Sequence, residues 1–146
     1  MNQLHVLLAE DDADDKEFFM EALRRLGLPH EVSWAKNTIE LFRLMEEKEF
    51  DLVILDINMP GINGKDCLHA MKAQAGLRSV PVIVMTVSKN TKDIDEVYEA
   101  GAHYYVIKPY SQVNNLETVR KIFSIDWKTP QPIPAKKDFL INLAFV

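Results

Sequence analysis

The side chains of this sequence that could do chemistry are polar groups standing directly after short apolar segments. Such positions occur at Glu10-Asp11, Asp56, Thr86 and Lys108. A carboxylate can act as the nucleophile that accepts a phosphoryl group, while an ammonium and a hydroxyl can hold its oxygens. If the fold brings these segment ends together, the sequence predicts phosphoryl transfer with Asp56 as the acceptor.

Clustered carboxylates at such a site would need a cation between them. Two carboxylates about 4 Å apart repel each other by roughly 4 kcal/mol at an effective dielectric constant of about 20. Gathering Glu10, Asp11 and Asp56 in one pocket therefore predicts Mg²⁺ (or Mn²⁺), which takes a few oxygen ligands and keeps several waters. The backbone carbonyl of Asn58, shortly after Asp56, is expected to be a further ligand.

Each of these residues also has an ordinary structural explanation. Acidic residues ahead of a helix are more often N-caps and partners of the helix dipole than metal ligands, and Asp12 fits that explanation best. Thr86 alone is a β-branched residue that ends a strand, and Lys108 alone is a surface charge. The functional interpretation depends on the coincidence of four polar positions at four strand ends.

Apolar periodicity divides the chain into alternating strand and helix segments. Continuous apolar runs predict strands over 4–9, 31–35, 51–55, 80–85 and 103–107. Helical periodicity predicts helices over 12–27, 38–48, a stretch ending near 74, 91–100 and 111–124. The side chains expected to be buried include Ile39, Phe42 and Met45 in the second helix and Val113, Leu116, Val119 and Phe123 in the fifth.

This alternation favours an α/β fold with one parallel sheet. Strands that are apolar on both faces need helices on both faces, and right-handed crossovers then give a doubly wound (βα)5 arrangement of the flavodoxin-like class, with five parallel strands. In such sheets ligands bind outside the carboxyl ends of the strands, near the switch point of the strand order. The polar positions all follow predicted strands, so we expect them to meet at one edge of the sheet.

Composition narrows the class of protein. The chain has 146 residues, as expected for one domain, and its net charge of −5 with no basic cluster disfavours a nucleic-acid-binding surface. No apolar stretch is long enough to span a membrane, and the N-terminus lacks a secretion signal. The single cysteine, Cys67, cannot form an internal disulfide and is expected to be buried, so we expect a cytoplasmic protein.

The C-terminal part of the chain differs from the rest. We expect one domain over 1–126, followed by an extension over 127–146. Prolines at alternate positions from Pro130 to Pro134 predict a stiff extended connector. The segment 138–146 is too apolar to remain solvated, and we expect it to dock on its own domain or on a second chain.

The motif set as a whole resembles the receiver domain of two-component response regulators. The matching residues, in order and at family-like intervals, are Glu10-Asp11, Asp56, Thr86 and Lys108-Pro109. The resemblance covers residues 4–124, and with no output domain behind it the chain is similar to the stand-alone CheY type. The chain also resembles the single-domain regulators that partner bacterial phytochromes, in its N-terminal motif Leu8 to Asp12 and in the tryptophan at position 127.

The resemblance implies a role for each site residue. Asp56 matches the aspartate that is phosphorylated from a kinase phosphohistidine. Glu10 and Asp11 match the acidic pair that organises Mg²⁺, with Asp11 the more direct ligand. Thr86 and Lys108 match the switch hydroxyl and the lysine that binds the phosphoryl group.

Further positions match residues that adjust the switch. Tyr105 matches an aromatic residue that changes rotamer on activation. Val87 is larger than the residue usual in the family and would narrow access to the site, while Asn58 and Ser88 match positions that tune how fast the phosphoryl group is lost. Pro109 would fix the direction of the preceding lysine. Together these features predict slow to moderate autodephosphorylation.

The implied function is a signalling switch and not an enzyme. A sensor histidine kinase or a histidine phosphotransfer protein would supply the phosphoryl group, and the surface of the fourth helix, fifth strand and fifth helix would bind a target or a second copy. Two alternatives remain open. A haloacid-dehalogenase-like phosphatase would need an acid where this chain has Asn58, and a phosphorylation-independent module usually lacks a site residue, whereas here all are present.

Overall fold

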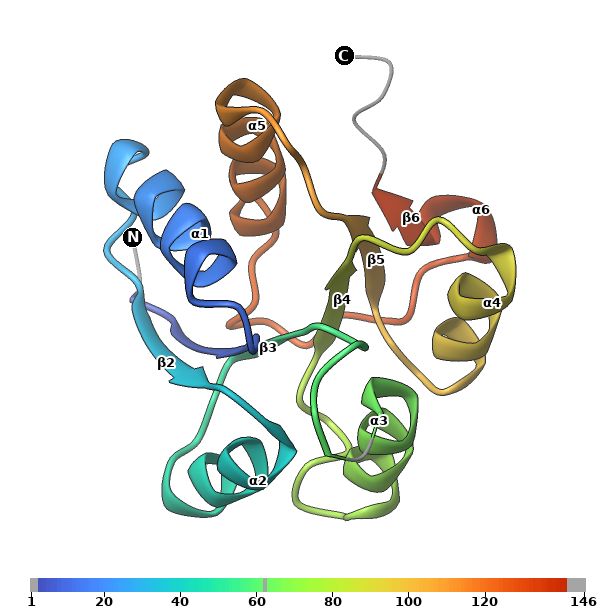
Figure 1. Ribbon diagram of the computed structural model, residues 1–146. Coiled ribbons are helices and arrows are strands. Elements are labelled where there is room, and N and C mark those ends of the chain that lie inside the picture. Colours follow the sequence, from blue (N-terminus) through green and yellow to red (C-terminus); the bar gives the residue numbers. More distant parts are fainter. Residues whose placement is uncertain (1–2, 62, 142–146) are drawn as a thin grey trace.

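The structure of the protein, a computed structural model, describes residues 3–61 and 63–141 (Figure 1). The elements in chain order are β1 (His5–Ala9), α1 (Ala13–Arg25), β2 (Glu31–Ala35), α2 (Thr38–Glu47), β3 (Leu52–Leu55), α3 (Gly64–Ala73), β4 (Val82–Thr86), α4 (Thr91–Glu99), β5 (Tyr104–Ile107), α5 (Gln112–Phe123), α6 (Lys136–Phe139) and β6 (Leu140–Ile141).

One parallel sheet forms the centre of the molecule, with the strand order β2-β1-β3-β4-β5-β6. Helices α1 and α5 cover one face, and α2, α3 and α4 cover the other (Figure 1). The chain moves outward from β1 to β2 on one side and to β3 on the other, so β1 and β3 bound the switch point of the strand order. The predicted doubly wound α/β fold is confirmed, with a sixth strand that the sequence did not predict.

Side-chain caps explain where the long helices begin. Asp12 accepts hydrogen bonds from the backbone amides of Asp14 and Asp15, as its sequence position predicted. Helices α2 to α5 begin in the same way, at Asn37, Asn63, Asn90 and Ser111. Gly27, with a φ of 63°, follows the end of α1 in the left-handed conformation that favours glycine.

Two predicted core residues lie on the surface instead. Ile39 is 78% exposed and Val113 is 70% exposed, so their assignment to the core was wrong. Polar residues take the inward positions beside them: Thr38 is buried at the start of α2, and Asn115 is buried on α5, where its Nδ2 donates to the Phe18 carbonyl at 2.9 Å. Asn115 can be buried because its amide finds a partner in the core.

The C-terminal extension docks on the domain over its described part. Trp127 is buried, and its indole Nε1 donates to the Ile122 carbonyl at 2.8 Å. The proline segment contains neither helix nor strand, and α6 and β6 follow it. Strand β6 pairs in parallel with β5 and supplies the sixth strand. The remainder of the predicted docking segment, 142–146, lies outside the described residues, and the domain boundary after 126 stays a proposal.

Cys67 is buried on α3, as expected, and burial raises the pKa of its thiol to about 12. A thiol in this environment stays protonated and packs as a small apolar side chain. Of the helices in the described part of the chain, none is both long and apolar enough to cross a bilayer.

Helix α3 lies very close to the segment after β3 at Gly64, where a side chain would not fit. A Cβ added at Gly64 would collide with the Ile57 Cα and lie 2.9 Å from its carbonyl carbon. We expect Gly64→Ala to lower the free energy of unfolding by about 1–3 kcal/mol, the usual cost of overpacking. Urea denaturation followed by tryptophan fluorescence measures the change. Gly76→Ala is the matched control, because a Cβ there meets nothing within 4 Å; equal losses in the two variants would contradict the prediction.

Candidate functional site

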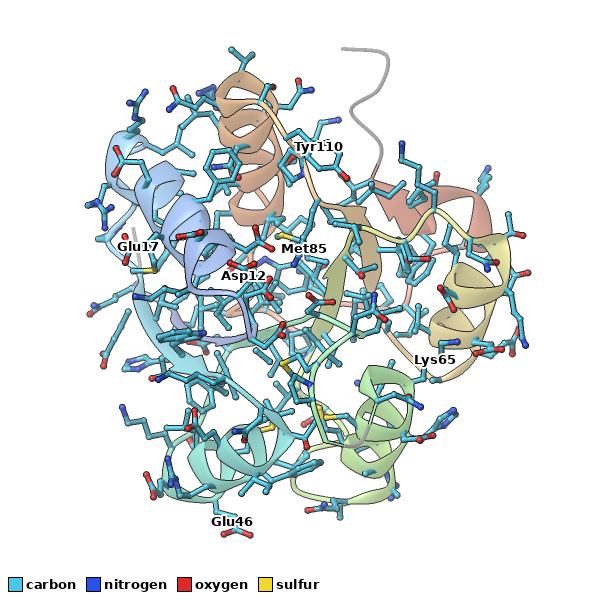
Figure 2. All side chains as sticks on the ribbon, viewed as in Figure 1. Asp12, Glu17, Glu46, Lys65, Met85 and Tyr110 are labelled. Carbon is cyan, nitrogen blue, oxygen red and sulfur yellow. The ribbon has the colours of Figure 1, made fainter. Side chains whose placement is uncertain are left out.

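The carboxyl edge of the sheet brings the predicted site residues together. Lys108, after β5, has its Nζ 2.8 Å from Asp56 Oδ2, after β3, and 2.5 Å from Glu10 Oε1, after β1. The same Nζ lies 2.8 Å from Asp15 Oδ2, on the first turn of α1. One ammonium therefore joins four elements of the fold. In Figure 2, Asp12 marks the start of α1, just after β1, and Tyr110 marks the exposed loop after β5.

Burial and charge act in opposite directions on this cluster. Glu10 and Asp56 are buried, whereas Asp15 is about half exposed. Burial raises the pKa of Glu10 to about 7, against the opposing effect of Lys108. Burial alone would lower the pKa of Lys108, but the three carboxylates that accept its hydrogen bonds raise it above its usual value. Lys108 is therefore a permanent cation at the centre of the site.

The chemistry of the donor set fits a divalent cation. Carboxylate oxygens of Glu10, Asp11 and Asp56 all lie within 4.8 Å of one another. Asp11 is exposed to solvent beside its two buried neighbours, which gives an ion a route to the cluster. An all-oxygen set of this kind suits Mg²⁺ or Mn²⁺ and does not suit metals that prefer sulfur or imidazole.

Thr86 and Asn58 link the end of β4 to the loop that carries the acidic acceptor. Thr86 is fully buried, and its Oγ1 accepts a hydrogen bond from Asn58 Nδ2 at 3.2 Å. The Asn58 backbone amide donates to Asp56 Oδ1 at 3.0 Å. The hydroxyl and the carboxylate are thus tied through a single residue, and a group bound at Asp56 would lie beside the hydroxyl.

Tyr105 and Ser88 form a second link, away from the carboxylates. Tyr105 is fully buried on β5, and its hydroxyl donates to the Ser88 carbonyl at 2.9 Å. Ser88 Oγ donates to Asp93 Oδ2 on α4 at 2.6 Å. Lys65, which projects from α3 towards α4 (Figure 2), contacts the other oxygen of Asp93 at 2.7 Å. The loop between β4 and α4 is therefore held from both β5 and α4.

Val87 and Pro109 directly follow the site residues Thr86 and Lys108 in the chain. Val87 is 50% exposed, so its branched side chain stands beside the site without filling it. Pro109 lines a small cavity together with Glu10, Asp15 and Lys108.

Two residues of this region were missed by the sequence analysis. Asp15 contacts Lys108, and the only sequence signal was an acidic residue in the first turn after a helix cap. Trp34, on β2, donates from its indole Nε1 to the Glu10 carbonyl at 2.6 Å. The ammonium groups of Lys16 and Lys36 lie over its ring, 4.8 Å and 5.0 Å from the ring centroid. The sequence near Trp34 does not predict this contact, because the contact depends on the pairing of β2 with β1.

The sequence profile of the response regulator receiver domain matches residues 6–120. The chain belongs to the response regulator receiver family. Among curated relatives, the chemotaxis protein CheY of Pseudomonas aeruginosa is 30% identical over 120 residues, which cover 82% of this chain and 96% of that protein. The predicted resemblance to CheY-like receiver domains is thereby confirmed.

Solved structures agree with this assignment. The phosphorylated cyanobacterial phytochrome response regulator RcpA has a TM-score of 0.80 and 26% identity, covering 92% of this receiver and all of that chain. The Mn²⁺-bound form of the response regulator Rcp1 has a TM-score of 0.76 and 25% identity, covering 90% and 99%. Receiver domains bind a divalent metal, in keeping with the carboxylate cluster of this chain.

The position of Trp34 provides a test of metal binding. Because its indole is bonded to the Glu10 carbonyl, we expect Mg²⁺ to change its fluorescence. The change should persist in Trp127→Phe and disappear in Trp34→Phe. Asp11→Asn should weaken Mg²⁺ binding by about tenfold or more, whereas Asp66→Asn on α3 should leave it unchanged. A full signal in Trp34→Phe, or unchanged affinity in Asp11→Asn, would contradict the assignment.

Proposed function

We propose that this receiver is a phosphorylation-dependent signalling switch in which Asp56 accepts a phosphoryl group from a phosphohistidine. The donor would be a sensor histidine kinase or a histidine phosphotransfer protein. The observation that carries the proposal is the position of Lys108, whose Nζ lies 2.8 Å from Asp56 Oδ2 within a cluster of carboxylates. A permanent cation beside a buried carboxylate is suited to receive a phosphoryl group, because it offsets the negative charge that the group brings.

The transfer step needs little covalent work from the protein. An Asp56 carboxylate oxygen forms the new O–P bond as the P–N bond breaks, and the histidine ring leaves with the electron pair. Glu10, Asp11, Asp56 and the Asn58 carbonyl would hold Mg²⁺ (or Mn²⁺). The bound ion would supply positive charge between the carboxylates and the phosphoryl oxygens. Asp56 then carries an acyl phosphate.

Lys108 and Thr86 would exchange partners when the group arrives. Lys108 can turn towards a phosphoryl oxygen most easily by releasing Asp15, the most exposed of its three carboxylate partners. Thr86 Oγ1 accepts from Asn58 in this structure and can instead donate to a phosphoryl oxygen. Movement of Thr86 would shift Ser88, which follows it in the loop, and would thereby alter the hydrogen bond from the Tyr105 hydroxyl to the Ser88 carbonyl.

The output surface is proposed to be α4, β5 and α5, which would bind a target or a second copy of the chain. RcpA is described as a phytochrome response regulator, so a phytochrome-type histidine kinase is the first donor to test. We further propose that the only reactions of the chain are its own phosphorylation and dephosphorylation. In a phosphatase of the alternative class an acid would stand at Asn58, whose amide side chain cannot supply a proton in this way.

Phosphorylation of Asp56 can be tested by intact-mass measurement. With acetyl phosphate or phosphoramidate and Mg²⁺, we expect the chain to gain the mass of one phosphoryl group. Asp56→Asn should gain none, because an amide is not a competent nucleophile for this step. Asp66→Asn, an exposed carboxylate on α3, is the matched control and should be modified like the wild type. An unmodified wild-type chain would contradict the proposal.

The rate of phosphoryl loss tests the role of Val87. Because Val87 stands half exposed beside Thr86, its removal should open the path of attacking water. We expect Val87→Ala to speed autodephosphorylation by up to about tenfold, equivalent to about 1.4 kcal/mol of activation free energy. The exposed Val113→Ala on α5 is the control. Loss within seconds in the wild type, or slower loss in Val87→Ala, would rule out this role.

A further inference from the structure

The C-terminal extension lies against the part of the receiver that the switch is proposed to move. Phe139 is fully buried, with its ring centroid 4.9 Å from that of Tyr98 on α4 and 6.3 Å from that of Tyr105 on β5. The Tyr98 hydroxyl donates to the Pro134 carbonyl at 2.9 Å. Lys136 Nζ contacts Asp95 Oδ1 on α4 at 2.5 Å. Three kinds of contact therefore fix residues 133–141 to α4 and β5.

Tyr105 connects this segment to the phosphoryl site. Its backbone pairs with Leu140 in the β5–β6 ladder, and its ring lies against Phe139. At the other end of the side chain, the hydroxyl donates to the carbonyl of Ser88, which follows Thr86 and Val87 in the loop after β4. Tyr105 is 0% exposed, so its ring cannot turn outward past Phe139 and β6 while the extension stays docked.

We propose that residues 133–141 are a built-in support for the switch and that Phe139 is its positioning residue. The inference rests on the proposed function and adds a regulatory element to the same site. Phe139 holds the Tyr105 ring in place, and Tyr105 holds the Ser88 carbonyl. The loop that follows Thr86 is thereby preorganised for a phosphoryl group at Asp56. Preorganisation of this kind strengthens binding because less ordering is needed when the ligand arrives.

Thermodynamic linkage makes the support reciprocal. If docking of the extension favours a phosphoryl group at Asp56, then a phosphoryl group at Asp56 must favour docking of the extension by the same factor. Phosphorylation would then tighten residues 133–141 on α4 and β5. A partner that binds the switched surface would meet a face built partly from the exposed residues 136–138 of α6.

The test uses the full chain with beryllofluoride and Mg²⁺ as the phosphoryl mimic, and isothermal titration calorimetry to measure affinity. We expect Phe139→Ala to weaken beryllofluoride binding about five- to fiftyfold, which lies within the range of typical coupling between sites. Phe139→Leu keeps an apolar side chain and should restore most of the affinity. Leu23→Ala is the matched control, since it also removes a buried side chain but lies on α1, against the opposite face of the sheet. It should lower stability without changing affinity.

A second variant and a second measurement keep the proposal testable if Phe139→Ala does not fold. Tyr98→Phe removes only the hydroxyl that donates to Pro134 and should weaken beryllofluoride binding in the same direction but less. Hydrogen exchange of the amides in 133–141 should slow in the wild type when beryllofluoride and Mg²⁺ are added. Unchanged exchange, or variants that bind as tightly as the wild type, would overturn the inference alone. A wild-type chain that binds no beryllofluoride would overturn the proposed function as well.

Discussion

The structure depends on one charged interaction, the contact of the Lys108 ammonium with the carboxylates of Glu10, Asp15 and Asp56. The ends of β1 and β3 are buried against each other, and their carboxylates would repel strongly without a cation between them. Lys108 follows β5, on the other side of β4, so its contacts connect strand ends that are not neighbours in the sheet. Removing one partner of such a buried cluster leaves an uncompensated charge, whose cost far exceeds that of losing an exposed ion pair.

Much of this site could be predicted from the sequence, because residues that follow the strands of a parallel sheet lie near one another in the fold. All strands of such a sheet end at one edge, so Asp56, Thr86 and Lys108 had to meet once their strands were recognised. Contacts that depend on side-chain reach were not accessible. Asp15 reaches Lys108 across 93 positions of the chain, and Ile39 was assigned to the core because a buried Thr38 is invisible to a count of apolar residues.

The loop between β4 and α4 is hydrogen-bonded to both β5 and α4 through Ser88. Thr86, the last residue of β4, is hydrogen-bonded to Asn58 just before the loop begins. Within the loop, the Ser88 carbonyl accepts from Tyr105 and the Ser88 hydroxyl donates to Asp93. Lys65 on α3 donates a hydrogen bond to Asp93 on α4, which links the two helices and lowers the pKa of Asp93. The two Ser88 contacts are partly shielded from water, and they connect the loop to both β5 and α4.

The sixth strand has a consequence for solubility. Strand β5 is a run of four aromatic and aliphatic residues, and left as the edge of the sheet it would offer unpaired backbone groups to other molecules. In the described part of the chain, the extension covers this edge with β6, which follows the charged residues 136–138 and the prolines before them. Lysine and proline beside an edge strand make it a poor template for intermolecular pairing. Loss of the extension would thus expose the unpaired backbone groups of β5. The shortened protein would then be expected to self-associate at a lower concentration than the full chain.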